Sequence, residues 1–481
     1  MKKSSRPSLK NGSQHVLDPV GGSVDNEAAT LFAEAARDFV RYVATDRSWA
    51  VFDGTRWRFV DEAPVVELWN EFRTRLLVNK LDKKGEPFVA DVSSSKFQAS
   101  SVVWMARGKH QLRTERGEFD QRKYELNTPG GVVALRTCEL LPHDASALHS
   151  RIAGMTPVFG VTPTRFLAWL DEVFLGDAEL IAYVRRLLAM WVVGEVGEQI
   201  LPVFFGEGAN GKGALLEVLY ALLSTEENVG YAREVSGDFV VKTKFPKHEA
   251  EVAALCGVRL LVVSELEASD VWNIKRVKEH SGGSRLTASF KGRDPFTFEP
   301  THSIVVETNR FPTLETVGTA ERRRFVMLPF DYEVPEDIRD RNFAKKLVAE
   351  EGPAIFGWIL EDTKRYLAEG LPAKPARVVA ATDSELDSLD LLQQFVQEWC
   401  EFGDDAWVST SELFLKYQLF CVTLDEKALS NRAFRTDFTR RFLPAALATD
   451  KDPSGKRRAW KGVRLQTRSA RDADPAERVS S

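Results

Sequence analysis

The spacing of apolar residues changes along the chain and first indicates a mixed module near the N-terminus. Between residues 26 and 37 the apolar positions recur with a helical period, and two β-rich runs then flank Asp53-Gly54. Asp-Gly between such runs is a strong signal for a β-hairpin. A polar, mixed stretch follows to about residue 156. We therefore expect an α+β domain over residues 29–160, preceded by a disordered tail at residues 1–28.

A helical pattern begins at Thr164 and gives way to short, nearly all-apolar runs. The helical part predicts a collar or linker over residues 161–199. The four apolar runs are residues 201–205, 260–263, 304–306 and 325–328. Such runs are typical of strands buried on both faces of a parallel sheet. They predict an α/β core with a mainly parallel sheet over residues 200–332, within a multidomain protein.

The remaining residues predict a helical extension, a linker and a smaller domain. The extension and Pro-rich linker cover residues 333–387, the last domain covers 388–466, and a second disordered tail covers 467–481. Ser409 begins a helix with a capping pattern, and residues 431–442 form a basic helix. Residues 452–455 then form a turn between two strand-like pieces.

Charge changes the picture of this last domain. Residues 431–468 hold eleven Lys or Arg and three Asp, a net charge of +8 in a chain whose formal net charge is -5. We expect a winged-helix-like domain in which Arg435, Arg457 and Arg458 contact DNA. A basic interaction tail is the alternative.

The composition of the whole chain excludes several classes of protein. With 65 Lys and Arg against 70 Asp and Glu over 481 residues, it is not a uniformly basic nucleic-acid coat. The four cysteines are far apart, which argues against a disulfide framework or a zinc knuckle. The most apolar run is far shorter than the ~20 residues of a membrane span. We expect a soluble cytoplasmic protein with no membrane partner.

The sharpest chemical signal is the Gly-Glu-Gly-Ala-Asn-Gly-Lys-Gly segment that follows the first apolar run and opens a helix. Glycines allow backbone N–H groups to surround phosphates, the helix N-terminus favours anions, and a lysine reaches the β- and γ-phosphates. A plain glycine-rich turn is the alternative. The candidate nucleotide-binding residues are Gly206, Gly208, Asn210, Gly211, Lys212 and Gly213.

Polar residues follow the next two apolar runs. Glu265 and Glu267 end one run, where a carboxylate could hold Mg²⁺ or orient the attacking water. Asn309 ends the other and could contact the γ-phosphate or its water. A solvated acidic loop and an ordinary turn residue are the alternatives.

Basic residues supply two further candidates. Arg323 and Arg324 precede the last apolar run, where an arginine can stabilise charge on the γ-phosphate of a neighbouring subunit. Lys278, Lys291 and Arg293 surround a Gly-rich, aromatic hairpin that could bind a nucleic-acid backbone. A solvated edge and a plain surface hairpin are the alternatives.

In this order the motifs resemble those of a superfamily 3 helicase of the AAA+ class, in the poxvirus and phage/plasmid primase-helicase group. The resemblance covers roughly residues 45–465 and does not depend on the glycine loop alone. The further segments that carry it are Trp49–Trp57, Leu126–Thr137 with Pro142-His143, Ser281-Gly282-Gly283, Phe311-Pro312 after Asn309, and Pro329-Phe330 after Arg323-Arg324.

The resemblance implies roles for individual residues. Lys212 would be the Walker A lysine, Glu265 and Glu267 the Walker B acids with Glu265 at the metal, and Asn309 the sensor. Arg323 would be the arginine finger. ATP and Mg²⁺ would be the cofactors, and the protein would form a ring, usually a hexamer, around DNA.

Three positions depart from the family pattern. Gly213 stands where the loop normally has Ser or Thr, Ser284 where Asp is common, and Ser289 where Arg is common. Because the Ser or Thr hydroxyl is a direct Mg²⁺ ligand, we expect a working ATPase with weakened metal affinity. The other two departures concern the DNA contacts of the hairpin.

The resulting expectation is an ATP-dependent replicative DNA helicase for phage- or plasmid-type replication, acting on single-stranded or forked DNA. A separate primase or other replisome proteins would be partners. Only about 45 residues precede the helicase-associated domain, too few for a catalytic fold, so we expect no primer synthesis by this chain alone. The alternatives are a DNA-binding replication initiator with a weak or structural ATPase and a P-loop phosphotransferase.

Overall fold

The computed structural model describes most of the chain, in two compact units. The described residues are 9, 13–18, 23–225, 229–243, 249–314, 317–424, 428–443, 450–451 and 458–466. The first unit comprises Met1–Pro312 and Arg323–Val379, and the second comprises Thr313–Arg322 and Ala380–Ser481. The last of these boundaries falls inside the segment predicted as a linker. Among the described helices, none has the length and apolar character needed to cross a membrane.

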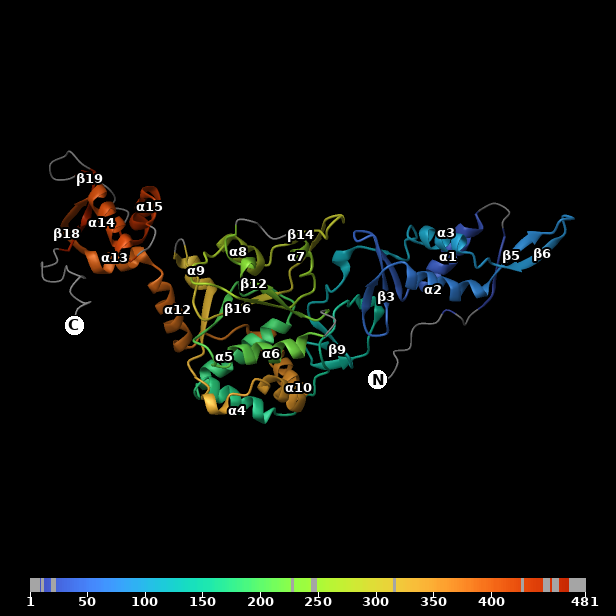
Figure 1. Cartoon of the computed structure of the whole chain (residues 1–481), viewed down its shortest axis with the longest axis horizontal. Coiled ribbons are helices and arrows are strands. Elements are labelled where there is room, and N and C mark those ends of the chain that lie inside the picture. The colour runs from blue at the N-terminus through green and yellow to red at the C-terminus, as the bar shows by residue number, and fades with distance from the viewer. Residues whose placement is uncertain are drawn as a thin grey trace. The chain divides into compact units, whose positions relative to one another are not determined.

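An α+β module forms the N-terminal part of the first unit, as predicted (Figure 1). Its strands make three small sheets, ordered β1-β5-β6, β4-β3-β2-β7 and β10-β9-β8. The helices are α1 (Val24–Ala36), α2 (Ala63–Phe72) and α3 (Lys96–Ala106). The strands are β1 (His15–Leu17), β2 (Val40–Val43), β3 (Ser48–Phe52), β4 (Trp57–Val60), β5 (Leu76–Leu81), β6 (Pro87–Asp91), β7 (Arg113–Thr114), β8 (Glu125–Thr128), β9 (Gly131–Ala134) and β10 (Glu139–Leu141).

The predicted N-terminal tail is partly structured, which corrects its boundary at residue 28. Strand β1 pairs in parallel with β5, and helix α1 begins at Val24. Leu17 is fully buried and joins the hydrophobic cluster around α1, α2 and α3. A three-residue strand is too short to show a period in the sequence, so only its burial reveals it.

The Asp-Gly hairpin has the predicted position and is closed by local hydrogen bonds. Strands β3 and β4 pair antiparallel. Asp53 Oδ1 accepts hydrogen bonds from the backbone N–H groups of Thr55 at 2.9 Å and Arg56 at 3.0 Å. Gly54 has φ 101°, a conformation that glycine adopts without strain. These contacts hold the pKa of the Asp53 carboxyl below its usual value, although burial opposes them.

A five-stranded parallel sheet is the centre of the first unit. Its order is β12-β13-β16-β11-β17, and every pairing is parallel. The strands are β11 (Leu201–Phe205), β12 (Ala232–Ser236), β13 (Leu260–Ser264), β16 (Ser303–Thr308) and β17 (Phe325–Pro329). The four strands predicted from apolar runs are confirmed. Strand β12 was not predicted, because two charged residues interrupt its apolar positions.

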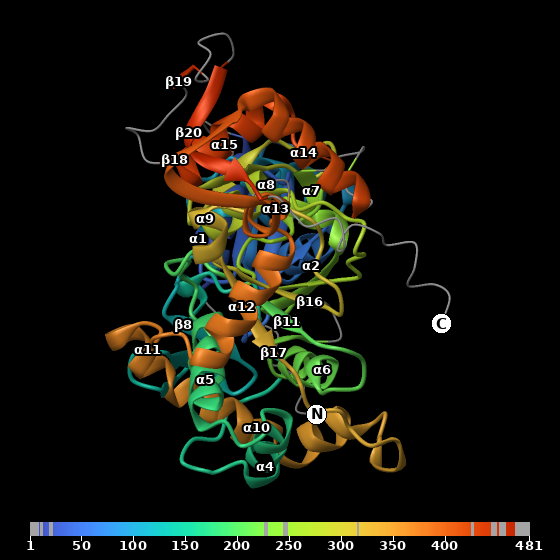
Figure 2. The ribbon, with the colours of Figure 1, turned by 90° about the vertical axis from the view of Figure 1, so that its left-hand side faces the viewer.

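Helices cover both faces of this sheet. Figures 1 and 2 show α5, α6 and α10 on one side and α8 on the other. The predicted helical collar corresponds to α4 and α5, whose apolar faces belong to the main core. The helices of this part are α4 (Thr164–Val173), α5 (Ala178–Val192), α6 (Lys212–Leu223), α7 (Glu249–Ala253), α8 (Ile274–Ser281), α10 (Phe343–Glu361) and α11 (Thr363–Glu369). Helices α9 (Thr319–Arg324) and α12 (Ala376–Ser388) each contain residues of both units.

Two buried arginines join the N-terminal module to the central sheet. Arg259, at the start of β13, donates to the backbone oxygens of Lys123 at 2.6 Å and Glu125 at 3.0 Å. In the opposite direction, Arg151 donates to the backbone oxygens of Cys256 and Gly230, both at 2.7 Å. Burial lowers the pKa of both guanidinium groups, and the carbonyl partners compensate part of that desolvation.

Replacing Arg259 with methionine should destabilise the first unit by about 3 kcal/mol, because several buried carbonyls lose charged donors at once. The midpoint of its urea unfolding transition should fall accordingly. Arg341→Met, at an exposed position before α10, is the control and should leave the midpoint nearly unchanged. Equal midpoints for the two variants would contradict a joining role for Arg259.

A buried histidine pair lies in the central domain. His280 Nδ1 and His302 Nε2 are 3.2 Å apart, and Phe239 packs against His280. Burial lowers the pKa of His302 to about 4, and burial with the charge of His302 lowers that of His280 to about 2. The charges of Arg276 and Arg151 act in the same direction. The pair is therefore neutral in the folded protein at neutral pH.

Stability should consequently fall as the pH drops from about 6.5, because the unfolded chain takes up protons that the folded pair excludes. Each histidine contributes a slope of up to about 1.4 kcal/mol per pH unit between the unfolded pKa and the folded pKa. Urea unfolding at pH 7.5 and 5.5 measures this loss. A double variant, His280→Gln with His302→Gln, should lose less unfolding free energy between these two pH values than the wild type. The control His110→Gln, at an exposed position, should lose as much as the wild type. Identical slopes in the three proteins would refute this origin.

The second unit contains a small α+β domain with its own core. A three-stranded antiparallel sheet, ordered β18-β20-β19, packs with three helices around Phe395, Phe434 and Trp460. Ser409 Oγ accepts from Glu412 N at 3.1 Å, which confirms the predicted cap. The elements are α13 (Leu391–Trp399), β18 (Cys400–Ser409), α14 (Thr410–Thr423), α15 (Asn431–Phe442), β19 (Asp450–Lys451) and β20 (Arg458–Leu465).

Candidate nucleotide-binding site

The glycine loop connects the end of β11, an inner strand of the sheet, to the start of α6. Gly206 has φ 148°, and a Cβ there would lie 2.5 Å from Phe330 O, so only glycine fits. Gly211 has φ 93° and caps α6, where a Cβ would lie 2.9 Å from Val173. Asn210 Nδ2 donates to Phe330 O at 2.9 Å and fixes the loop against β17. The loop is thus fixed at a helix N-terminus, a position that favours anions.

Lys212 is folded back onto this loop. Its Nζ donates to the backbone oxygens of Gly206 at 2.7 Å and Glu207 at 3.0 Å, and to Asn210 Oδ1 at 3.1 Å. The side chain is buried, and desolvation lowers its pKa while the charge of Glu307 opposes that shift. The Lys212 ammonium group thus binds three oxygens of its own loop. In a nucleotide complex, phosphate oxygens would take their place.

Glu265 and Asn309 lie at the same edge of the sheet as the loop. Glu265 directly follows β13, Asn309 directly follows β16, and both side chains are exposed. In an open parallel sheet, ligands bind at the carboxyl ends of the strands. Glu265 has φ 63°, a rare conformation for a residue with a side chain, and such strain concentrates at functional sites. Glu267 is also exposed, two residues further on, and its backbone N–H donates to Asp270.

The structure adds a carboxylate that the sequence analysis missed. Glu307 is on β16, paired in register with Phe204 of β11. Burial and the charge of Glu234 raise the pKa of the Glu307 carboxyl, while Lys212 lowers it. A charged residue at the end of an otherwise apolar strand was the signal available in the sequence. Strand order, which places β16 beside β11, was the missing information.

The acidic groups at this edge fit a metal that arrives with a nucleotide. Among the described residues, no group of three His, Cys, Asp or Glu side chains is arranged to hold a metal ion. Mg²⁺ normally uses one or two protein carboxylates and completes its shell with phosphate oxygens and water. Glu265 and Glu307 are the carboxylates at this end of the sheet that could supply hard oxygen donors to such an ion.

The two candidate arginines lie at the amino-terminal end of β17, whereas the glycine loop follows the carboxyl end of β11. Their surroundings differ. Arg324 is buried and donates to Gln199 O at 3.1 Å and Ser281 Oγ at 2.6 Å. It therefore serves the packing of the core in this arrangement. Arg323 is exposed, just before β17, which runs parallel to β11. Because a five-residue strand separates this end from the loop, roughly 17 Å lie between them. Arg323 cannot contact its own loop.

The predicted hairpin is present, but its aromatic residues are used in packing. Strands β14 (Leu286–Ala288) and β15 (Phe296–Phe298) pair antiparallel. Phe290 stacks on Phe296 with ring centroids 6.0 Å apart, and Arg116 of the N-terminal module lies over Phe290. Lys291 and Arg293 are exposed in the loop between the strands.

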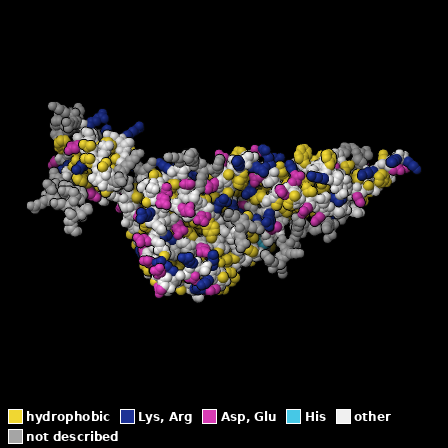
Figure 3. Space-filling model, in the orientation of Figure 1, with side chains coloured by type: hydrophobic (Ala, Val, Ile, Leu, Met, Phe, Trp, Pro, Cys, Tyr) yellow, Lys and Arg dark blue, Asp and Glu magenta, His cyan; other side chains and the backbone are white. Residues whose placement is uncertain are grey.

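The remaining basic and polar candidates are distributed over separate surfaces. Lys278 is exposed on α8, and Ser284 is exposed before β14. Ser289 Oγ donates to Glu249 at 2.8 Å. On the face drawn in Figure 3, Lys and Arg side chains lie among Asp and Glu side chains, so this face is not uniformly basic.

The candidates of the second unit lie on its last helix and strand. Arg435 is half-buried on α15, and Arg458 is exposed at the start of β20. On the same helix, Arg440 pairs with Asp437, and Arg441 pairs with Asp390. Arg457 lies outside the described residues.

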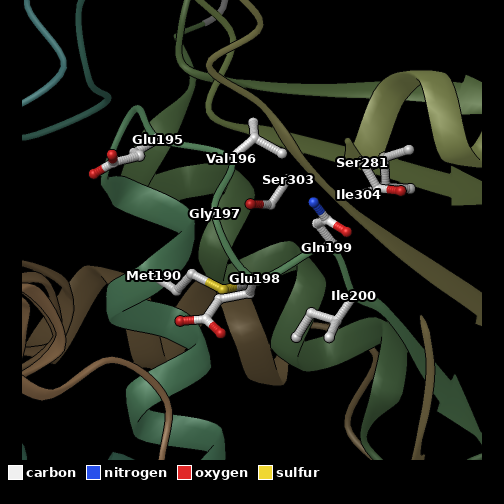
Figure 4. A pocket seen from close by; sticks show the side chains of 10 residues that line it. All are labelled: Met190, Glu195, Val196, Gly197, Glu198, Gln199, Ile200, Ser281, Ser303 and Ile304. Atoms are coloured by element: carbon white, nitrogen blue, oxygen red, sulfur yellow. The ribbon is translucent and has the colours of Figure 1, made fainter. Parts of the chain in front are cut away.

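A small pocket lies at the amino-terminal ends of β11 and β16, away from the glycine loop (Figure 4). Glu195, Glu198 and Gln199 of the segment after α5 line it, together with Ser281 and Ser303. The glycine loop follows the carboxyl end of β11, so this pocket and the loop are at opposite edges of the sheet.

The fold and the glycine loop define a multidomain α/β protein, and its relatives are viral. Residues 29–175 match the family described as D5 N terminal like, and residues 204–324 match a family of unknown function (DUF5906). Over 196 residues the chain is 28% identical to "Putative helicase L207/L206" of Acanthamoeba polyphaga mimivirus, covering 41% of this chain and 19% of that protein. Over 293 residues it is 25% identical to "Putative helicase 184R" of Invertebrate iridescent virus 6, covering 53% and 29%.

Two solved structures of the NrS-1 C-terminal region share the fold. One has a TM-score of 0.53 and the other 0.51, both at 11% sequence identity. The matches cover 90% and 91% of this chain, and 99% and 100% of the NrS-1 chains. At this identity the likeness concerns the fold alone.

The D5 N terminal like match and the two viral relatives indicate the same group of proteins. With its D5 N-terminal-like domain, the chain fits the D5-like group of phage and poxvirus primase-helicases. In the alignments it spans less than a third of the length of either viral relative.

Proposed function

We propose that the protein is an ATP-dependent DNA helicase of the superfamily 3, AAA+ type, which acts in replication. The observation that carries the proposal is the glycine loop between β11 and α6, with Lys212 buried inside it and Glu265 and Asn309 at the same edge of the sheet. Backbone donors, a cation and carboxylates at the carboxyl ends of neighbouring strands support this proposal, because triphosphate hydrolysis uses these groups. The viral relatives carry the name helicase, which supports DNA as the partner.

In the proposed mechanism, the loop N–H groups and Lys212 bind the phosphates of ATP. Mg²⁺, when bound, would neutralise charge on the β- and γ-oxygens. Glu265 and Glu267 are proposed as the acids that hold the metal and orient the attacking water, with Glu265 at the metal. Asn309 would contact the γ-phosphate or this water.

Assembly into a ring is part of the proposal. Arg323 is exposed at the edge of the sheet opposite its own loop, so it could act only on a nucleotide held by another subunit. An arginine supplied in this way stabilises transition-state charge. A ring, with six subunits as the expected number, would bring each Arg323 to a neighbour's loop.

We propose that the domain over residues 388–466 is winged-helix-like and binds DNA. Its element order is α13-β18-α14-α15-β19-β20. One strand lies between the first two helices, two strands follow the third helix, and the three strands form a small antiparallel sheet. Helix α15 would enter a groove, with Arg435 toward the DNA, and Arg458 would contact the backbone. Lys278, Lys291 and Arg293 of the first unit are proposed as additional backbone contacts.

Two linked measurements test this function. We expect size-exclusion light scattering with ATP and DNA to show a homo-oligomer, and ATP hydrolysis to increase when single-stranded or forked DNA is added. Strong duplex binding with little DNA-stimulated hydrolysis would instead indicate a replication initiator with a structural ATPase. If the protein is a monomer that does not bind DNA, and if DNA does not change its rate of ATP hydrolysis, it would instead be a phosphotransferase. That result would contradict the proposal.

A further inference from the structure

Gly213, directly after the loop lysine, has no side-chain oxygen, although this position supplies a metal-binding hydroxyl in P-loop ATPases. The backbone does not require glycine there. Gly213 is the second residue of α6 and does not have a positive φ. Glycine has a low intrinsic helix propensity, so the local conformation does not favour it at this position.

The space beside Gly213 points toward a carboxylate. A Cβ built on Gly213 would lie 3.6 Å from Glu307 Oε1, an ordinary contact distance. Glu307 is on β16, which pairs with β11, the strand that leads into the loop. Among the described residues, its carboxylate has no hydrogen-bond or ion-pair partner within contact distance, although the charge of Lys212 acts on it. An acceptor thus faces the position from which the usual hydroxyl is missing.

We propose that Glu307 replaces this hydroxyl as a protein ligand of the Mg²⁺ that accompanies the nucleotide. The inference rests on the proposed function of the loop. Two oxygens bound to neighbouring positions of one Mg²⁺ lie roughly 3 Å apart, since each is about 2.1 Å from the ion. The 3.6 Å between Glu307 Oε1 and a Cβ built at position 213 puts the carboxylate beside the position of the missing hydroxyl. Glycine leaves room for the larger carboxylate and its ion.

This exchange changes an expectation drawn from the sequence. The lack of a hydroxyl at Gly213 predicted weak metal binding, with Glu265 as the remaining acid. A carboxylate carries a negative charge that a hydroxyl does not, and it is a preferred Mg²⁺ ligand. Metal binding with nucleotide should therefore be preserved in the wild-type protein.

The test measures nucleotide binding with and without metal on the full chain, without hydrolysis. A fluorescent AMPPNP analogue is titrated in EDTA and in Mg²⁺, and the ratio of the two Kd values gives the metal effect. Glu307→Gln should reduce this ratio by about 10-fold or more, because one charged ligand is lost. Binding in EDTA should remain. Adding Gly213→Ser to Glu307→Gln should restore much of the ratio.

The control is Glu217→Gln, which removes an exposed carboxylate from the same helix and should leave the ratio unchanged. Thermal unfolding of each variant shows whether it is folded, and Mn²⁺ EPR in the presence of AMPPNP reports the ligand change directly. An unchanged ratio and spectrum in Glu307→Gln would overturn the inference while the proposed function stands. Equal losses in EDTA and in Mg²⁺ would also overturn it, because Glu307 would then act only as a charge partner of Lys212. A wild-type protein that binds no nucleotide in either buffer would refute both proposals.

Discussion

Lys212→Ala should reduce ATP hydrolysis by about 10³-fold, to the level of the background. The lysine is the only cation whose side chain is placed inside the described glycine loop, where its Nζ already binds three oxygens. Without it, the charge that develops on the phosphates loses the one cation that the loop itself holds in place. Steady-state phosphate release measures the loss.

Lys345→Ala is the matched control, because Lys345 is an exposed lysine on α10. It should hydrolyse ATP at the wild-type rate. Circular dichroism distinguishes a lost reaction from a lost fold. Wild-type hydrolysis by folded Lys212→Ala would mean that the glycine loop is not the ATP site.

Arg323→Ala should reduce hydrolysis by about 10³-fold or more while nucleotide binding persists. The side chain is exposed at the edge of the sheet opposite the loop, so its effect must act between subunits. Arg341→Ala, also exposed in the first unit, serves as the control and should retain activity. Hydrolysis rates and the Kd of a nucleotide analogue separate the two effects.

Mixing two inactive variants tests the direction of this contact. Lys212→Ala subunits retain Arg323, and Arg323→Ala subunits retain the loop lysine. A mixed ring therefore contains some interfaces with an intact loop facing an intact arginine, and it should regain part of the activity. If mixed rings form and remain inactive, Arg323 does not act on a neighbour's nucleotide.

The elements that could be predicted from the sequence are those with a local signal. Strands β11, β13, β16 and β17 are buried on both faces, so each reads as an apolar run. The glycine loop lies within eight consecutive residues between a strand and a helix. Its position could therefore be assigned without knowing the tertiary fold.

The missed features depend on contacts between distant parts of the chain. Strand β12 carries charged residues because it is at the edge of the sheet. Glu307 is near Gly213 only because β16 is inserted between β13 and β11. The burial of Arg324 depends on Ser281 and Gln199, which are distant in sequence. None of these neighbours follows from periodicity or spacing.

The most direct test of the central claim is strand separation on a forked DNA duplex with one labelled strand. The wild-type protein should release that strand with ATP and Mg²⁺, and not with AMPPNP. Lys212→Ala should bind the fork without releasing the strand. The proposed helicase function would be contradicted if the wild-type protein bound the fork and hydrolysed ATP but left the duplex intact, on forks with either a 5′ or a 3′ single-stranded arm.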